Sequence, residues 1–223
     1  MNMRSNDILG IGLPDSGIAR EATELLRDTR SELLFTHSVR VYLWGALAGR
    51  RKDIAFDPEL LYVGAMFHDL GLTGPFHSSP LRFEVDGANA ARDFLRGHGI
   101  AEADVYKVWM AIALHTTPGV PEFMHAEAAL LQTGAAMDVA GRFYDDFTDE
   151  ERDAVTAAYP RADTFGHDII DMFHEGLKDR PATTIGTFNE DFLACKEPRF
   201  QRVDMCSVIL ASPWTQKRCR NAL

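Results

Sequence analysis

Apolar residues recur every three or four positions along most of this chain, which is the period of an amphipathic helix. The pattern predicts helices at about 18–30, 31–49, 60–71, 82–96, 101–114, 122–142, 149–158, 164–178, 184–194 and 203–210. Alternating apolar and polar runs are scarce, and β-branched residues do not cluster, so strand signals are weak. The sequence therefore predicts an all-α fold, a single-domain helical bundle.

The domain boundaries follow from the same pattern. Residues 1–16 are mixed in character and read as an N-terminal arm, whereas 17–223 carry the helical periodicity. A chain of 223 residues with 46% hydrophobic content can bury a core of its own, which favours one domain. Residues 73–80 contain two prolines, a glycine and three hydroxyl side chains, so we expect a non-helical loop there.

Charge and cysteine usage narrow the class of protein. The 23 basic and 33 acidic residues give a net charge of -10, which argues against a partner that is nucleic acid. No apolar stretch has the length of a membrane span, and the first ten residues lack the apolar run of a signal peptide. Three cysteines without C-x-x-C spacing fit a reducing compartment. We expect a cytoplasmic protein with no membrane partner, and homo-oligomerisation stays open.

Four residues with metal-binding chemistry fall in apolar helical settings. His37 lies in the apolar stripe of the second helix, and the pair His68-Asp69 ends an apolar run just before Gly71. Asp138 sits among Ala, Met and Val, where a carboxylate is costly to bury without a cation or hydrogen-bond donors. Together these side chains predict a site with two nitrogen and two oxygen ligands for one divalent ion.

Each residue taken alone has a plainer interpretation. A histidine in an apolar stripe is more often a hydrogen-bonded core residue, and Asp138 alone could cap a helix internally. His-Asp pairs also arise by chance, and the chain has a second one at 167–168. Its neighbourhood offers His167, Asp171 and His174 on one helix face, but the spacing of the charges there favours a solvated surface.

The joint order of these residues resembles a known family. His37, then His68-Asp69, then Asp138 match the H…HD…D pattern of the HD-domain metal-dependent phosphohydrolase superfamily, over a motif core of about 31–142. The segments 35–40, 67–73 and 82–88 look like the cyanamide-hydratase-like branch, and Ser212-Pro213-Trp214 fits it less specifically. An HD-type helical bundle is the fold that the resemblance implies.

The resemblance implies one divalent ion, with Zn favoured and Fe, Mn or Ni as alternatives. His115 ends an apolar helix, and the resemblance leaves it a role as an acid/base outside the metal ligands. The alternative is that His115 only caps its helix. The other intervening histidines, at 77, 98 and 125, lack the doublet typical of dinuclear members. Substrate-wall candidates are Leu72, Phe76 and Thr116, beside the predicted ligands and His115.

The resemblance implies an enzyme that hydrates a small nitrile, with cyanamide converted to urea by a metal-bound hydroxide, formally a lyase with hydrolase machinery. The rival is a phosphohydrolase that acts on a nucleotide or another phosphate ester. That chemistry needs cations near the metal, and the motifs offer only Arg40 and Arg82. A third alternative is a metal-binding sensing or scaffold domain without turnover, in which the coordination shell would be closed.

Overall fold

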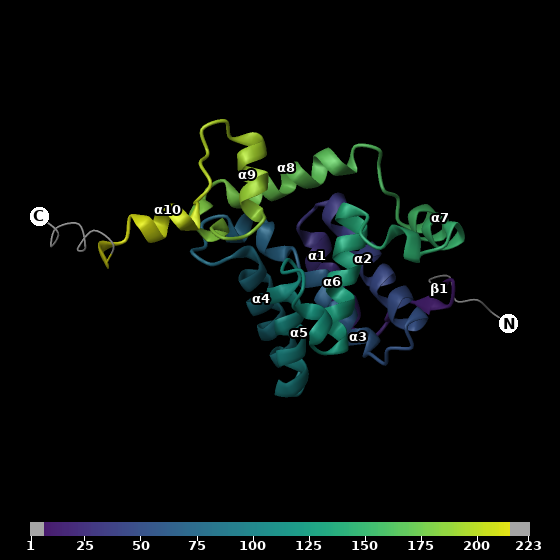
Figure 1. The fold of residues 1–223 in the computed structure, drawn as a ribbon. Coiled ribbons are helices and arrows are strands. Elements are labelled where there is room, and N and C mark those ends of the chain that lie inside the picture. The colour runs from purple at the N-terminus through teal and green to yellow at the C-terminus, as the bar shows by residue number, and fades with distance from the viewer. Residues whose placement is uncertain (1–6, 215–223) are drawn as a thin grey trace, which may run out of the picture.

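A computed structural model describes residues 7–214, and within that range the regular secondary structure is almost entirely helical (Figure 1). The helices are α1 (Gly17–Asp28), α2 (Glu32–Arg51), α3 (Pro58–Phe67), α4 (Phe83–Gly97), α5 (Glu102–Leu114), α6 (Ala126–Ala140), α7 (Asp149–Ala158), α8 (Phe165–Leu177), α9 (Asn189–Lys196) and α10 (Met205–Leu210). Two two-residue strands, β1 (Asp7–Ile8) and β2 (Ile11–Gly12), form an antiparallel hairpin ahead of α1. The predicted all-α fold is confirmed.

The differences from the predicted elements are local. The loop expected to be non-helical contains a 3₁₀ turn, Gly74–Phe76, and another turn, Leu70–Leu72, follows α3. The segment expected at 122–142 divides into a 3₁₀ turn, Pro121–Phe123, and α6, which continues through Gly134 without a break. Part of the predicted arm and the end of the predicted domain, residues 1–6 and 215–223, lie outside the described residues.

Helices α2 and α6 form the centre of the bundle, and two glycines let them approach closely. A Cβ at Gly134 would lie 2.1 Å from the carbonyl oxygen of Val41, and one at Gly45 would lie 2.8 Å from that of Leu130. Only a residue without a side chain fits such a backbone contact. The close crossing brings the functional face of α2 against that of α6.

The end of α3 is fixed by a similar contact with α4. A Cβ at Gly71 would lie 2.0 Å from the carbonyl oxygen of Phe83, and one at Gly87 would lie 2.5 Å from that of Phe67. Asp57 begins α3 by accepting hydrogen bonds from the backbone N–H groups of Glu59 and Leu60. The position of residues 68–69 at the far end of α3 is therefore determined by backbone packing.

Helices α8 and α9 cover one end of the bundle and build a second, smaller apolar core (Figure 1). Arg180, which is 5% exposed, joins this layer to α4 and to the turn after α3. Its guanidinium donates to Asp86 at 2.5 Å, to the carbonyl of Leu81 at 3.2 Å and to the carbonyl of Gly71. A buried cation with this many partners anchors the layer to the bundle.

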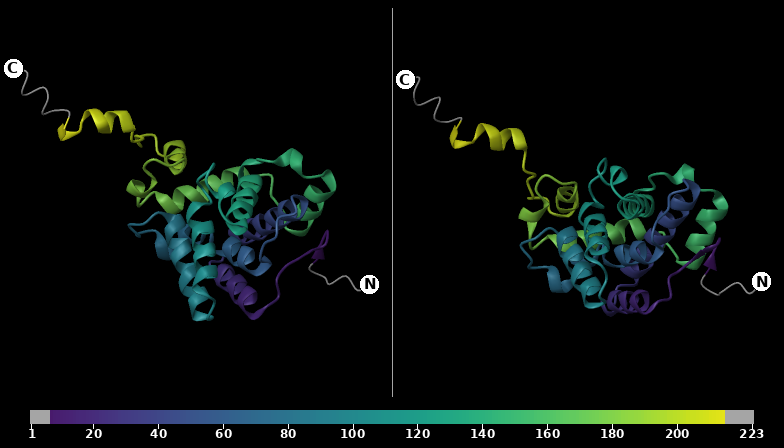
Figure 2. Two further views of the ribbon diagram at one scale, coloured as in Figure 1. Left: turned by 60° about the horizontal axis from the view of Figure 1, so that its bottom comes forward. Right: turned by 90° about the horizontal axis from the view of Figure 1, so that it is seen from below.

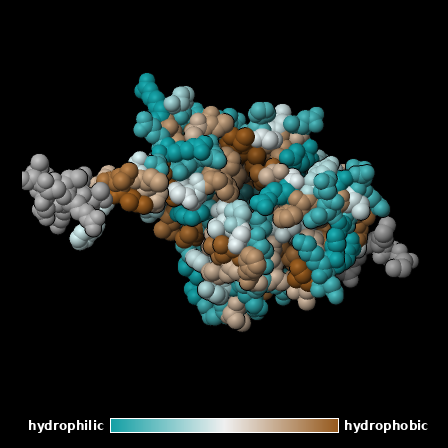
Figure 3. All heavy atoms as spheres, viewed as in Figure 1, coloured by the Kyte–Doolittle hydropathy of each residue, from teal (hydrophilic) through white to brown (hydrophobic). Residues whose placement is uncertain are grey.

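Helix α10 leaves the bundle and carries the chain away from it in each of the views (Figure 2). Its side chains Met205, Val208 and Leu210 are exposed, and they make an apolar surface on this extension (Figure 3). Within residues 7–214, no helix has both the length and the apolar character needed to cross a membrane.

Candidate metal centre

Three of the four predicted ligands meet at one point inside the bundle. The Nε2 atoms of His37 and His68 are 3.2 Å apart, and they lie 3.4 Å and 3.2 Å from Oδ2 of Asp69. All three side chains are at most 2% exposed, and one ligand atom from each lies within 4.8 Å of the others. Two imidazoles and a carboxylate at this separation are a donor set for a divalent ion.

The hydrogen bonds of the outer ring nitrogens assign the tautomers. The Nδ1–H of His68 donates to the carbonyl of Ala65 at 2.7 Å, and the Nδ1–H of His37 donates to Oδ2 of Asp138 at 2.7 Å. In the neutral rings, Nε2 therefore carries a lone pair, and two lone pairs and a carboxylate face each other. Such an arrangement is favourable only when a cation lies among them.

Asp69 gives a second indication that a cation belongs here. Its Oδ1 is buried and, within residues 7–214, accepts no hydrogen bond. A buried carboxylate oxygen without a partner is costly, and a metal ion would supply what is missing. The residues present therefore fit a divalent ion, with His37, His68 and Asp69 as the protein ligands.

The pKa directions show that the cluster attracts positive charge. Burial by itself lowers the pKa of His37, but the hydrogen bonds and negative charges of Asp138 and Asp69 outweigh it and raise the pKa to about 9. Burial likewise opposes ionisation of Asp69, yet the nearby imidazoles of His68, His115 and His37 hold its pKa well below the usual value. The raised pKa of His37 comes from the negative charge gathered in the cluster, and a bound cation would compensate the same charge.

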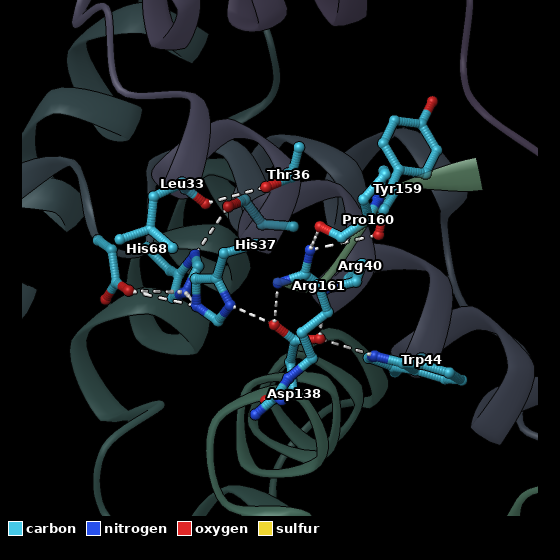
Figure 4. A network of polar contacts seen from close by, with 12 residues as sticks. Leu33, Thr36, His37, Arg40, Trp44, His68, Asp138, Tyr159, Pro160 and Arg161 are labelled. Atoms are coloured by element: carbon cyan, nitrogen blue, oxygen red, sulfur yellow. Dashed lines mark hydrogen bonds and ion pairs between the residues drawn. The ribbon is translucent and has the colours of Figure 1, made fainter. Parts of the chain in front are cut away.

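Asp138, predicted as the fourth ligand, is placed behind His37 instead (Figure 4). Its Oδ1 accepts from Nε of Arg40 at 2.7 Å and from Nε1 of Trp44 at 3.1 Å. Its Oδ2 accepts from Nδ1 of His37 at 2.7 Å and from the terminal nitrogen of Arg40 at 2.9 Å. Four donors use the four lone-pair directions of the carboxylate, and in this geometry Asp138 holds the ring of His37 in place. Its role as a fourth metal ligand stays a prediction.

His115 approaches the cluster from the end of α5. Its Nδ1–H donates to the carbonyl of Ile112 at 2.7 Å, which directs the other ring nitrogen inward. Nε2 lies 3.4 Å from Oδ1 of Asp69, and the ring packs against that of His68 with centroids 5.0 Å apart. The side chain does not belong to the compact three-residue group. Its place fits an acid/base beside the metal ligands.

A cavity of about 380 Å³ opens onto this cluster. The residues that line it include, besides the cluster and His115, Thr116, Pro118, Gln132, Ala135, Ala136, Val139, Ala140, Arg142, Phe173, Phe188, Asp191 and Phe192. Most of these side chains are small or apolar. The two charged side chains outside the cluster, Arg142 and Asp191, are exposed, so the interior of the cavity is largely uncharged.

Of the three predicted wall residues, the structure brings only Thr116 to the cavity. Leu72 is 2% exposed and packs in the second core, where its backbone and side chain contact Gly176. Phe76 lies half-buried in the 3₁₀ turn Gly74–Phe76 and is not among the lining residues. The structure does not place Leu72 and Phe76 at the cavity, because the turn after residue 69 packs against α8.

The remaining histidines serve other purposes. His174 bonds Glu197 at 2.7 Å near the surface, and His167 is exposed, as expected for a solvated helix face. His98 bonds Glu21 at 3.0 Å, and His77 donates to the carbonyl of Leu72 at 3.0 Å. Among residues 7–214, no second group of metal-binding side chains is formed by these histidines.

The sequence did not predict two features of the site. The aromatic side chains of α8 and α9 form part of the cavity wall, although they lie far along the chain from the motifs. The sequence suggests Arg40 only as a cation for substrate, whereas in the structure it is 0% exposed and bound to Asp138. The position of Arg40, three residues after His37 on the same helix face, is the sequence feature that could have indicated a place beside the site.

Comparison with known proteins agrees with the motif order. The family model described as HD domain matches residues 34–157, which is more than half of the chain. The match contains His37, the His68-Asp69 pair, His115 and Asp138, and it ends before α8. No curated protein matches the chain.

Proposed function

Because the chain belongs to the HD-domain family, we propose that it is a metal-dependent enzyme that hydrates a small neutral nitrile, with cyanamide as the leading candidate. HD domains are typically metal-dependent hydrolases, and the buried His-His-Asp group is compatible with a metal. The choice of substrate goes further than the family and rests on the character of the cavity.

His37, His68 and Asp69 would hold one divalent ion. A site with two imidazoles and one carboxylate suits Zn, with Fe, Mn or Ni as alternatives. When bound, such an ion supplies Lewis acidity and makes water available as a nucleophile near neutral pH. Three protein ligands leave positions for water and substrate, which favours a catalytic site over a closed structural one.

The observation that carries the substrate proposal is the engagement of the arginines near the site. Arg40 is bound to Asp138 and to the carbonyls of Tyr159 and Pro160 at 3.3 Å and 2.9 Å. Arg82 is bound to Glu84 through two nitrogens, at 3.3 Å and 2.9 Å. Arg40 is buried and engaged, and Arg82 is paired with Glu84 and is not among the lining residues of the cavity. A phosphate at the metal ligands would therefore lack a cationic partner, and burying it there is costly.

The cavity wall supports a small uncharged ligand. Phe173, Phe188 and Phe192 close one side, and Ala135, Ala136, Val139 and Ala140 provide small side chains on the side of α6. An apolar enclosure excludes water and strengthens the electrostatic interactions of the few polar groups inside it. A linear nitrile without charge fits such a space.

His115 has the position required for proton transfer. Hydration adds the oxygen of one water to the nitrile carbon and places its two hydrogens on nitrogen, which yields urea from cyanamide. A group must deliver a proton to the nitrile nitrogen as the carbon–oxygen bond forms. His115 lies beside Asp69, and its Nε2 faces the cluster, so we assign it this relay.

One observation favours the rival phosphohydrolase. Arg142 is the single arginine or lysine among the described residues that line the cavity. It is exposed, so it would meet a phosphate at the mouth and not at the metal ligands. Phosphate ester hydrolysis is therefore the second candidate function.

The test compares two reactions under the same metal loading. Purified protein is stripped with a chelator, reloaded with one divalent metal at a time, and supplied with cyanamide or with nucleoside monophosphates. We expect urea from cyanamide and little inorganic phosphate from the nucleotides. Rapid release of phosphate with no urea would establish the rival, and inactivity toward both would return the choice to other small nitriles or amides.

A further inference from the structure

Gln132 is a buried amide on the cavity wall without a partner. Its side chain is 4% exposed, it lines the cavity, and within residues 7–214 its amide makes no hydrogen bond. The hydroxyl of Thr133, by contrast, donates to the carbonyl of Ala129 at 2.8 Å. A buried amide is normally satisfied, so an amide left open toward a cavity indicates a ligand or a water that completes it.

The position on α6 makes Gln132 the polar group of an otherwise apolar face. Ala135, Ala136 and Val139 follow it at three, four and seven residues, so all four side chains lie on one side of the helix and line the cavity. Asp138, a charged neighbour on the helix, is committed to His37 and Arg40. The wall that α6 contributes therefore offers a ligand one polar group, the amide of Gln132.

The other uncharged polar side chain of the wall, that of Thr116, is already engaged. The hydroxyl of Thr116 donates to Oε1 of Glu84, which leaves only its acceptor lone pairs for a ligand. The amide of Gln132 offers both two N–H donors and a carbonyl acceptor. A ligand that satisfies both halves of the amide must carry an acceptor atom and an N–H group.

We propose that Gln132 binds and orients the substrate, and that it selects neutral molecules with both an acceptor nitrogen or oxygen and an N–H donor. This inference rests on the proposed function, because it concerns the same cavity. Cyanamide and simple carboxamides have both groups, whereas a dialkylcyanamide has the acceptor alone. A site built to bond an N–H group rejects the analogue without it, because the amide carbonyl is then left unpaired.

The experiment uses the variant Gln132→Met, which keeps the length of the side chain and removes its hydrogen bonds, with Gln201→Met as the matched control at an exposed glutamine. Metal content and thermal unfolding are measured first, and neither should change in either variant. The ratio of kcat/KM for cyanamide over dimethylcyanamide is then compared with that of the wild type. We expect Gln132→Met to lower this ratio roughly tenfold, the effect of losing about one hydrogen bond, and Gln201→Met to leave it unchanged.

Binding of urea to the metal-loaded protein, followed by calorimetry, separates this inference from the proposed function. If cyanamide is not turned over but urea binds the wild type and not Gln132→Met, the proposed reaction fails and the binding role of Gln132 stands. An unchanged ratio in an active Gln132→Met protein would overturn the inference. A wild type that neither binds urea nor turns over cyanamide would overturn it as well.

Discussion

Arg40 and Asp138 form a bidentate ion pair in the centre of the bundle, with nitrogen–oxygen distances of 2.7 Å and 2.9 Å. The Arg40 side chain is 0% exposed, so its buried positive charge is compensated by this carboxylate and by two backbone carbonyls. The same carboxylate accepts the Nδ1–H of His37 and so fixes the ring that faces the metal ligands (Figure 4). The ion pair thus connects the stability of the α2–α6 crossing to the geometry of the site.

The variant Asp138→Asn is expected to lower stability and metal affinity together. In chelator-treated protein, the free energy of unfolding should fall by about 3 kcal/mol, because Arg40 loses its compensating charge in a buried site. Metal affinity should fall by roughly 10- to 100-fold, the usual effect of removing a partner that orients a ligand. Denaturant unfolding and competition with a chromophoric chelator measure the two quantities.

The control for Asp138→Asn is Glu151→Gln, which removes the partially exposed ion pair with Arg51. A pair at the surface contributes little, so the free energy of unfolding should change by less than about 1 kcal/mol. If folded Asp138→Asn protein takes up no metal even at saturating concentrations, Asp138 is a direct ligand and its assigned place behind His37 is wrong.

His115→Asn is expected to separate catalysis from metal binding. Metal content should stay at the wild-type value, because His115 is outside the three-residue group. The rate of urea formation should fall by roughly two to four orders of magnitude, as expected for loss of a general acid or base. His167→Asn, at an exposed histidine, should change neither quantity. Metal loss in His115→Asn would instead make His115 a ligand.

The crossing of α2 and α6 predicts opposite effects for two glycine substitutions. Gly134→Ala places a methyl group 2.1 Å from the carbonyl of Val41, so we expect a loss of about 3 kcal/mol or more in the free energy of unfolding. Gly166→Ala, in α8, meets nothing within 4 Å and should raise stability by about 0.5 to 1 kcal/mol. Both are measured by denaturant unfolding. Equal tolerance of the two substitutions would contradict the close crossing.

Glu84 predicts a pH dependence of stability. It accepts hydrogen bonds from Arg82, Thr116 and Asn189. Burial raises its pKa, but the bonds from Arg82 and Thr116 and the charges of Arg82 and His115 outweigh burial and lower the pKa below its usual value. A carboxyl group with a lowered folded-state pKa stabilises the protein above its unfolded pKa of about 4.3, and this stability is lost as pH falls through the folded pKa.

At pH 7 the free energy of unfolding of the wild type should therefore be larger than that of Glu84→Gln. The gap between the two free energies should narrow at pH 4. Arg82 and His115, the ionisable groups facing Glu84, are present in both proteins, so the comparison isolates the contribution of the Glu84 carboxyl group. Glu24→Gln, at an exposed glutamate of α1, serves as the control and should show a small gap at both values. A gap that is constant from pH 7 to pH 4 would contradict the ionised state of Glu84.

The helices and the His-Asp cluster were predictable because both depend on local signals. The spacing of apolar residues predicts most helices to within a few residues. His37 and the His68-Asp69 pair stand out because they are polar side chains within apolar helical stretches. The order of these residues along the chain indicated the HD-domain family, and the family model matches residues 34–157.

The role of Asp138 and the cavity wall depended on packing that no local pattern contains. A carboxylate in an apolar helix predicts compensation but not whether a metal or an arginine supplies it, and here Arg40 does. The sequence favours Leu72 and Phe76 for the wall because they follow the His-Asp pair. The backbone contact between Gly71 and Phe83 turns this segment away, and Phe173 and Phe192 take the place beside the cavity.

The ligand assignment is tested most directly by metal stoichiometry after chelation and reloading, measured by plasma mass spectrometry on folded protein. The wild type should take up one divalent ion per chain, and His37→Ala, His68→Ala and Asp69→Ala should each take up almost none and lose the rise in thermal stability that metal gives the wild type. His174→Ala, in the surface cluster of α8, should behave like the wild type. One ion per chain in folded Asp69→Ala and His68→Ala proteins would show that the metal centre lies elsewhere.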